Sequence, residues 1–176
     1  MEVAYLGGGC FWCTEAYFNR LKGVSAVESG YAGGRTENPT YKEICTGTTG
    51  HAELIKVSYD AEVISFEDLL EVFFQTHDPT TLNRQGADVG TQYRSVIFYQ
   101  SEEERQQAQA FIDQVANTYW NNPIVTTLEP LKQFYPAEAY HNDYYNLNPG
   151  QGYCRIVIAP KLKKLEQQFG DKLKTS

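Results

Sequence analysis

The hydrophobic positions of the chain follow two periods in turn, which predicts alternating strands and helices. Stretches in which every second residue is apolar predict strands, and apolar residues spaced three and four apart predict helices. The expected strands are residues 3–6, 24–31, 51–60, 95–99, 124–128 and 154–158. The expected helices are residues 10–22, two segments that begin after Ser65 and Ser101, and a last segment marked by Leu162, Leu165 and Phe169. This order predicts an α+β fold in which helices pack on a small mixed or antiparallel sheet.

Two of the expected helices carry a capping signal at their start. Ser65 precedes Asp68 by three residues and Ser101 precedes Glu104 by three, which is the spacing of a capping box. For helix 10–22, Gly23 is a candidate C-cap. The buried face of that helix should consist of Thr14, Tyr17, Phe18 and Leu21. The loops at 30–39 and 77–92 are longer than a connection needs, and loops of that length usually have a function.

Length and composition restrict the class of protein. A chain of 176 residues suits one domain at about 150 residues per domain, so we expect residues 1–176 to form a single catalytic domain. With 41% hydrophobic and 21% charged residues, the chain is expected to be globular rather than disordered. It contains no apolar run long enough to span a bilayer and starts without a basic signal-peptide region, so a cytoplasmic location is expected. The net charge of −7, without a basic run, argues against binding to nucleic acid.

The sharpest chemical signal is Gly7-Gly8-Gly9-Cys10, between the first expected strand and the first expected helix. A cysteine at a helix start meets free backbone N–H groups and the positive end of the helix dipole, both of which stabilise a thiolate. The glycines let the backbone approach a substrate closely. We therefore predict that Cys10 is a nucleophile. Phe11 and Trp12 would either join the core or form a small apolar pocket over the thiol.

Cys13 follows Cys10 by three residues, so both thiols lie on one side of the helix and within the usual Cα spacing of a disulfide. A C-x-x-C pair is typical of thioredoxin-like redox chemistry or of half a metal site. Structural zinc is not expected, because the sequence has no second C-x-x-C or H-x-x-x-H to supply two more ligands. Cys45 is expected to be a buried structural cysteine. The histidines have no metal-ligand spacing to one another and are expected to be structural: His51, His77 and His141.

Glu53 is a carboxylate on the apolar side of the expected strand 51–60. It shares parity with Ile55, Val57 and Tyr59, near the start of the strand. If its side chain points inward, desolvation raises its pKa and favours the protonated acid. A protonated carboxyl group near a thiolate can act as a general acid. The alternative is a partly exposed glutamate at the strand end.

These residues belong to a series of motifs that extends from about Tyr5 to Ile158. The motifs are Gly9-Cys10-Phe11-Trp12, Gly30-Tyr31-Ala32-Gly33-Gly34, Asn38-Pro39-Thr40-Tyr41, Gly50-His51-Ala52-Glu53, His77-Asp78-Pro79-Thr80, Gly90-Thr91-Gln92-Tyr93-Arg94-Ser95, Ala137-Glu138 with His141 and Tyr144, and Gly152-Tyr153-Cys154. In content and order they resemble the type A peptide methionine sulfoxide reductases. The resemblance implies reduction of methionine-S-sulfoxide, free or in proteins, to methionine. It also implies a two-layer sandwich with a ferredoxin-like core and decorating loops.

The resemblance also implies roles for individual residues. The Cys10 thiolate would attack the sulfoxide sulfur and become a sulfenic acid. Glu53 would protonate the sulfoxide oxygen, and Tyr41 and Tyr93 would hydrogen-bond it. The substrate-site positions of the family correspond to Phe11, Trp12, Asp88 and Tyr144, the first two around the S-methyl group.

A second thiol must then convert the sulfenic acid into a disulfide. Cys154 is favoured because its glycine-rich flank would let it reach Cys10; Cys13 is the second candidate, for which the helix must distort, and a relay through both is open. Many members of the family lack a cysteine at the position of Cys13, and the segment 148–154 is one residue longer than the common form. The resemblance implies thioredoxin as electron donor and no metal, flavin or nicotinamide.

Two other functions remain open on the sequence alone. One is a general thiol–disulfide oxidoreductase built on Cys10-x-x-Cys13. That function would give no role to Glu53, Tyr41 or Tyr93. The other is a module that binds oxidised methionine without turnover.

Overall fold

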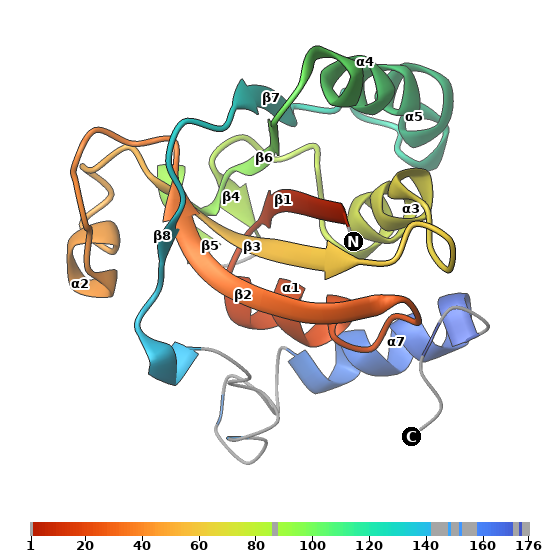
Figure 1. The fold of residues 1–176 in the computed structure, drawn as a ribbon, viewed down its shortest axis with the longest axis horizontal. Helices are drawn as coiled ribbons and strands as arrows, with labels where there is room; N and C mark the ends of the chain where they lie inside the picture. Colours follow the sequence, from red (N-terminus) through yellow and green to blue (C-terminus); the bar gives the residue numbers. More distant parts are fainter. Residues whose placement is uncertain are drawn as a thin grey trace.

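A six-stranded sheet organises the computed structural model of the chain, which describes residues 2–85, 88–141, 148, 152, 158–170 and 173 (Figure 1). The order of the strands in the sheet is β7-β6-β1-β3-β2-β8. Neighbouring strands are antiparallel, except that β6 and β7 are parallel. The strands are β1 (Glu2–Gly8), β2 (Val24–Ala32), β3 (Ala52–Tyr59), β6 (Ser95–Tyr99), β7 (Thr127–Pro130) and β8 (Tyr135–Pro136). Two further strands, β4 (Arg84–Gln85) and β5 (Asp88–Val89), pair only with each other in a small hairpin.

The helices cover mainly one face of this sheet, as Figure 1 shows for α1 and α7. The α-helices are α1 (Phe11–Phe18), α2 (Tyr41–Ile44), α3 (Phe66–Thr76), α4 (Glu102–Phe111), α5 (Asn117–Tyr119) and α7 (Ala159–Phe169). Shorter turns are η1 (Thr91–Tyr93), the π-helical η2 (Ile112–Ala116) and η3 (Ala139–His141). The large core lies between α1, α3, α7 and the sheet, and a smaller apolar cluster on the opposite face is covered by Leu131 and Phe134. The predicted mixture of helices and strands in one fold is confirmed.

Local sequence rules explain most of the element boundaries. The capping box at the start of α3 is complete, because Ser65 and Asp68 each accept a hydrogen bond from the backbone N–H of the other, at 3.0 and 3.2 Å. At α4 only half of the expected box forms: Glu104 N–H donates to Ser101 Oγ at 3.2 Å, while the Glu104 carboxylate bonds Gln100. The predicted faces are correct, since Thr14, Tyr17, Phe18 and Leu21 are all buried.

Most boundaries differ from the sequence prediction by no more than two residues, and larger differences occur at three places. Helix α1 ends at Phe18 rather than residue 22, because the chain turns there and Leu21 forms an isolated bridge with Leu173. Strand β7 begins at Thr127 instead of 124, since Val125 N–H donates to the Pro79 carbonyl of a loop at 2.8 Å. The predicted strand 154–158 falls mostly outside the described residues, and its last residue, 158, is in helical conformation at the start of α7.

The alternation of β3 places a carboxylate in the large core. Ile55, Val57 and Tyr59 belong to the large core, whereas Ala52 and Leu54 belong to the smaller cluster on the opposite face. Glu53 has the parity of the first group and is fully buried, so of the two orientations that the sequence left open the inward one is observed.

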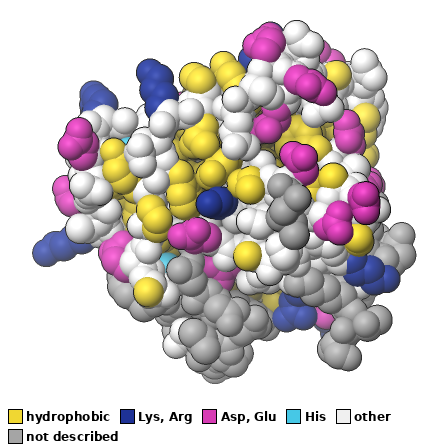
Figure 2. All heavy atoms as spheres, in the orientation of Figure 1, with side chains coloured by type: hydrophobic (Ala, Val, Ile, Leu, Met, Phe, Trp, Pro, Cys, Tyr) yellow, Lys and Arg dark blue, Asp and Glu magenta, His cyan; other side chains and the backbone are white. Residues whose placement is uncertain are grey.

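The surface is mainly acidic on the side of α3 and α4. In Figure 2 acidic side chains gather over these helices, where Glu2, Glu67, Glu103 and Glu104 border a hollow. Lys and Arg side chains of the described residues stand apart from one another on the face shown. Among the described helices, none is long and apolar enough to cross a membrane.

Candidate active site

The turn between β1 and α1 brings the Cys10 thiol to the start of a helix. Gly9 has φ +93°, a left-handed conformation that favours glycine, and a Cβ there would lie only 2.7 Å from Cγ of Gln85. Cys10 is the N-cap of α1, with φ −62° and ψ 127°, so it lies just outside the helix and its carbonyl accepts from Cys13 and Thr14 N–H. The glycine turn therefore permits the close packing that fixes the cysteine.

Burial opposes ionisation of this thiol. Cys10 is 8% exposed, and desolvation is the main reason why its pKa is raised well above the ordinary value. A hydrogen bond with the Cys13 thiol and the nearby Glu53 add to the increase, while a bond from the Trp12 N–H acts in the opposite direction. The sequence predicted a stabilised thiolate; in the structure burial is the largest influence on this thiol and favours its neutral form.

Glu53 is a protonated acid beside this thiol. The Phe11 N–H donates to Glu53 Oε1 at 3.2 Å, and the buried Oε2 accepts no hydrogen bond from the described residues. Desolvation raises the pKa of Glu53 to about 8, with a smaller increase from Asp88 and from Cys13. The carboxyl group therefore holds a proton at neutral pH, as expected for a general acid.

Two phenols and a second carboxylate surround Glu53. Burial is the main cause that raises the pKa of Tyr41 and of Tyr93, and Glu53 is the second cause for both. Asp88 of β5 is half-buried and raises the pKa of Glu53 and of Tyr93. The structure thus brings the thiol, the acid, both phenols and Asp88 into one site, with the phenols neutral and able to donate hydrogen bonds.

Aromatic rings form one wall of the site. The Tyr41 ring lies 4.4 Å from the His141 ring and 6.2 Å from the rings of both Phe11 and Trp12, centroid to centroid. The Trp12 Nε1–H donates to His141 Nδ1 at 3.0 Å, which fixes the indole against the histidine. Phe11 is fully buried and Trp12 is half-buried. Of this pair Phe11 belongs to the large core, and Trp12 packs against that core beside Tyr41 and His141.

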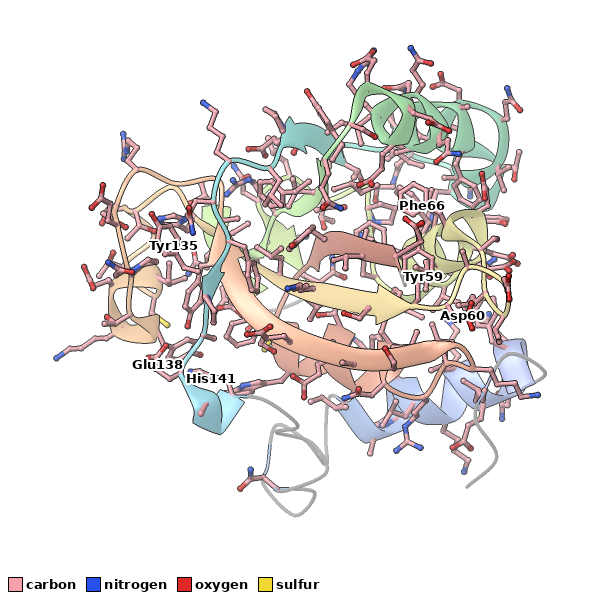
Figure 3. All side chains as sticks on the ribbon, viewed as in Figure 1. Tyr59, Asp60, Phe66, Tyr135, Glu138 and His141 are labelled. Atoms are coloured by element: carbon pink, nitrogen blue, oxygen red, sulfur yellow. The ribbon has the colours of Figure 1, made fainter. Side chains whose placement is uncertain are left out.

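Glu138 connects this wall to the sheet. Its two carboxylate oxygens accept from Tyr31 Oη at 3.1 Å and from Tyr41 N–H at 3.0 Å. Figure 3 shows Glu138 and His141 on the segment after β8, close to α2. The sequence indicated a motif at Ala137-Glu138 but no role for it. In the structure the Glu138 carboxylate holds the start of α2, and hence Tyr41, at the site.

Two residues near the site were not anticipated by the sequence. Cys45 is exposed rather than buried, and its thiol hydrogen-bonds the Tyr41 side chain, so the interpretation as a buried structural cysteine is wrong. The spacing of four residues between Tyr41 and Cys45 on a short helix was the available signal. Gln85 binds the backbone of Asp78 twice, accepting from its N–H at 2.8 Å and donating to its carbonyl at 2.9 Å. No local pattern indicated that contact.

The remaining candidates are structural or lie outside the described residues. His51 accepts a hydrogen bond from the Gly34 N–H at 3.1 Å and forms another with the Thr36 carbonyl at 2.7 Å. His77 forms a hydrogen bond with Ser95 Oγ at 2.8 Å. Burial lowers the pKa of His77 to about 4, so this histidine is neutral. Tyr144 and Cys154 lie outside the described residues. Within the described part of the chain, no three His, Cys, Asp or Glu side chains are grouped to hold a metal ion.

A buried thiol near a buried, protonated carboxyl group is the arrangement of a thiol enzyme with its own proton donor. The family profile "Peptide methionine sulfoxide reductase" matches residues 2–173, and the chain belongs to that family, which confirms the resemblance found in the motifs. The peptide methionine sulfoxide reductase MsrA of a Nitratiruptor species is 58% identical over 172 residues, 98% of each chain.

Solved structures agree with this assignment. Mxr1 from Saccharomyces cerevisiae in reduced form superposes with a TM-score of 0.79 at 38% identity, covering 87% of this chain and 88% of Mxr1. Mxr1 in complex with Trx2 superposes with a TM-score of 0.55 at 29% identity, covering 81% of this chain and 84% of that one.

Proposed function

We propose that this protein reduces methionine-S-sulfoxide, free or in proteins, to methionine, with Cys10 as nucleophile and Glu53 as general acid. The observation that carries the proposal is the buried Glu53 carboxyl group, protonated at neutral pH and bonded to the residue that follows Cys10. A sulfoxide oxygen leaves only when it is protonated, so this acid supplies what the thiol chemistry needs. Membership of the family supports the choice of substrate.

The first step transfers the sulfoxide oxygen to Cys10. The Cys10 sulfur attacks the sulfoxide sulfur and forms a transient sulfur–sulfur bond while Glu53 protonates the oxygen. The oxygen then moves to the Cys10 sulfur as both the sulfur–oxygen bond to methionine and the sulfur–sulfur bond break, which leaves methionine and a Cys10 sulfenic acid. The proton of the Cys10 thiol replaces the one that Glu53 gives, so the carboxyl group begins and ends protonated. Methionine sulfoxide is reduced by two electrons and Cys10 is oxidised by two.

The phenols and the aromatic wall position the sulfoxide. Tyr41 and Tyr93 stay protonated because burial raises the pKa of each, so both can donate to the sulfoxide oxygen. Phe11 and Trp12 provide the apolar contact for the S-methyl group, and the Trp12–His141 bond keeps the indole in place. The negative charge of Asp88 raises the pKa of Glu53 and so favours its protonated form.

Cys13 is the thiol that we propose attacks the sulfenic acid first. Its thiol is 6% exposed and near enough to Cys10 to raise the pKa of that thiol. A Cys10–Cys13 disulfide requires less distortion of α1 than the sequence indicated, since Cys10 is the extended N-cap and not part of the helix. The Cys10–Cys13 bond forms and the oxygen leaves as water. Cys154, the resolver favoured on the sequence, is then the predicted relay to the external reductant.

Thioredoxin is the electron donor that we propose, supported by the complex of Mxr1 with Trx2.

The core β1-α1-β2-β3-α3-β6 is proposed to be ferredoxin-like, because its strands follow the order β6-β1-β3-β2 and are all antiparallel. Residues 1–176 are proposed to form one catalytic domain, which agrees with a family match over 2–173. The cytoplasmic location stays a prediction.

A general thiol–disulfide oxidoreductase is the second candidate, favoured by the contact between the Cys10 and Cys13 thiols. It leaves the protonated Glu53 without a role, because disulfide exchange needs no oxygen leaving group.

One experiment separates the two functions. The purified chain is incubated with dithiothreitol and either the R or the S epimer of N-acetyl-methionine sulfoxide, and methionine product is measured by chromatography. We expect turnover of the S epimer alone and slow reduction of insulin. Insulin reduction without sulfoxide turnover would establish the alternative.

A further inference from the structure

We propose that the outer face of the β4–β5 hairpin, defined as Leu82, Arg84 and Val89, binds the polypeptide segment that flanks methionine sulfoxide in an oxidised protein. The inference rests on the proposed function and adds how a protein substrate, as opposed to a free one, is held. Figure 1 shows the hairpin at the end of the sheet where α1 begins.

The two faces of the hairpin differ in exposure. Gln85 and Asp88 form one cross-strand pair and are half-buried, whereas Arg84 and Val89 form the next pair and are exposed. Leu82, two residues before Arg84, is also exposed. The base of the hairpin is closed by Gly90 N–H, which donates to the Asn83 carbonyl at 2.9 Å. One set of side chains therefore faces inward and the other faces solvent.

The inner face is fixed against the catalytic groups. Gln85 packs so closely on Gly9 that a Cβ on that glycine would lie 2.7 Å from Cγ of Gln85. Asp88 is near enough to Glu53 to raise its pKa. The outer face is thus one residue away from side chains that contact the catalytic turn.

The exposed apolar side chains are unusual for their position. Val89 is 71% exposed and pairs with Arg84 across the hairpin, and Leu82, two residues before Arg84 in the turn that leads into β4, is 70% exposed. Single exposed apolar residues need no explanation, but neighbouring ones beside a site indicate an interaction surface. Arg84, between them, forms no ion pair with the described residues and offers guanidinium N–H donors.

The occupant follows from the chemistry of the substrate. Methionine is mostly buried, and its oxidation to a polar sulfoxide disrupts the apolar core around it. The segment that carries the sulfoxide therefore exposes apolar neighbours. Because the outer face is within about 10 Å of the catalytic turn by chain and cross-strand spacing, it should contact substrate residues one to three positions from the sulfoxide.

The test compares substrates that share the sulfoxide and differ in their flanks. We would measure kcat/KM with dithiothreitol for N-acetyl-methionine-S-sulfoxide, for a peptide with Leu and Phe within three residues of the sulfoxide, and for the same peptide with Ser and Gly there. The variant is Leu82→Ser/Val89→Ser, and the control is Val63→Ser. Val63 is 59% exposed and follows Tyr59 and Asp60, which Figure 3 labels at the opposite end of β3 from Glu53.

We expect the double variant to lower kcat/KM about tenfold for the apolar peptide and to leave the free substrate unchanged. The control variant should change neither. An equal loss of kcat/KM for all three substrates would mean that the hairpin only holds the catalytic groups in place. No loss of kcat/KM would mean that the outer face does not contact the substrate. Either result overturns the proposal. A loss confined to an assay with limiting thioredoxin would assign the face to the reductant instead and also overturn it. Absence of turnover by the unmodified chain would reject the proposed function itself.

Discussion

The carboxyl group of Glu53 accepts a hydrogen bond from the backbone N–H of Phe11 at 3.2 Å. This bond joins the start of β3 to the first residue of α1, immediately after the Cys10 nucleophile. It partly offsets the desolvation of the carboxyl group without reversing it, so the pKa of Glu53 is still about 8. The proton donor is therefore held next to the thiol by the backbone itself.

Replacement of the nucleophile should abolish activity and leave the fold intact. Cys10→Ser removes the only atom proposed to accept the sulfoxide oxygen, and a hydroxyl of similar size suits the same N-cap position. We expect no methionine product above background and an unchanged circular dichroism spectrum. Cys45→Ser, at an exposed cysteine, serves as the thiol control and should retain turnover, because the serine hydroxyl can keep the contact with the Tyr41 side chain. Activity in Cys10→Ser would remove this residue from its role.

The reduction step should depend on the protonated form of Glu53. Since the pKa of Glu53 is raised to about 8, the single-turnover rate should be level below that pH and fall as the pH rises through it. Glu53→Gln should slow the reduction step by a factor of about 10²–10⁴ and remove the fall of the rate at high pH. The single-turnover rates of the unmodified chain and of Glu53→Gln are measured by rapid quench from pH 6 to about 9. A variant with a nearly normal rate would assign the proton to the phenols or to water.

The same carboxyl group should make the folded state sensitive to pH. Its pKa is raised from 4.5 to about 8 on folding, so the folded chain binds the proton more tightly. That contribution to stability is complete below pH 4.5 and is lost as the pH rises to 8, by on the order of 5 kcal/mol for this group alone. Glu53→Gln should therefore unfold in urea at a higher midpoint than the unmodified chain at pH 8, with a smaller difference at pH 5. Equal differences at both pH values would contradict the assignment.

The order of disulfide formation should be visible in a single turnover without reductant. If Cys13 attacks first, Cys13→Ser should accumulate the Cys10 sulfenic acid, trapped by dimedone and identified by mass spectrometry. In Cys154→Ser the Cys10–Cys13 disulfide should form at the normal rate, and only thioredoxin-dependent turnover should slow. Trapped sulfenic acid in Cys154→Ser, with a normal disulfide in Cys13→Ser, would reverse the order.

Loss of the Glu138 anchor should weaken catalysis through Tyr41. Glu138→Ala removes the acceptor for the Tyr31 hydroxyl and for the Tyr41 N–H, so the start of α2 is no longer held. We expect kcat/KM to fall about tenfold, the usual size of a lost charge-assisted hydrogen bond. The effect should be much smaller on a Tyr41→Phe background, because the two changes act on one phenol. Glu62→Ala, at an exposed turn, should have no effect.

Much of the fold could be predicted because local rules decided it. β6 has the predicted bounds, Ser95–Tyr99, and the Ser65–Asp68 box forms as its spacing requires. Predictions were wrong where a distant segment intervened, as at β7, whose start is displaced by the bond from Val125 to Pro79. The end of α1 is a second example, because Leu21 bridges to Leu173.

The sequence by itself determined the identity of the chemical groups. Cys10 after three glycines, and Glu53 at an apolar position of a strand, follow from short-range periodicity, which needs no knowledge of the rest of the chain. Only the tertiary structure decided the protonation states. Ionisation depends on how completely water is excluded and on which charges lie nearby, and both depend on segments far away in the sequence. That is why burial raises the pKa of the Cys10 thiol, where the sequence indicated a stabilised thiolate, and why a strand glutamate holds its proton.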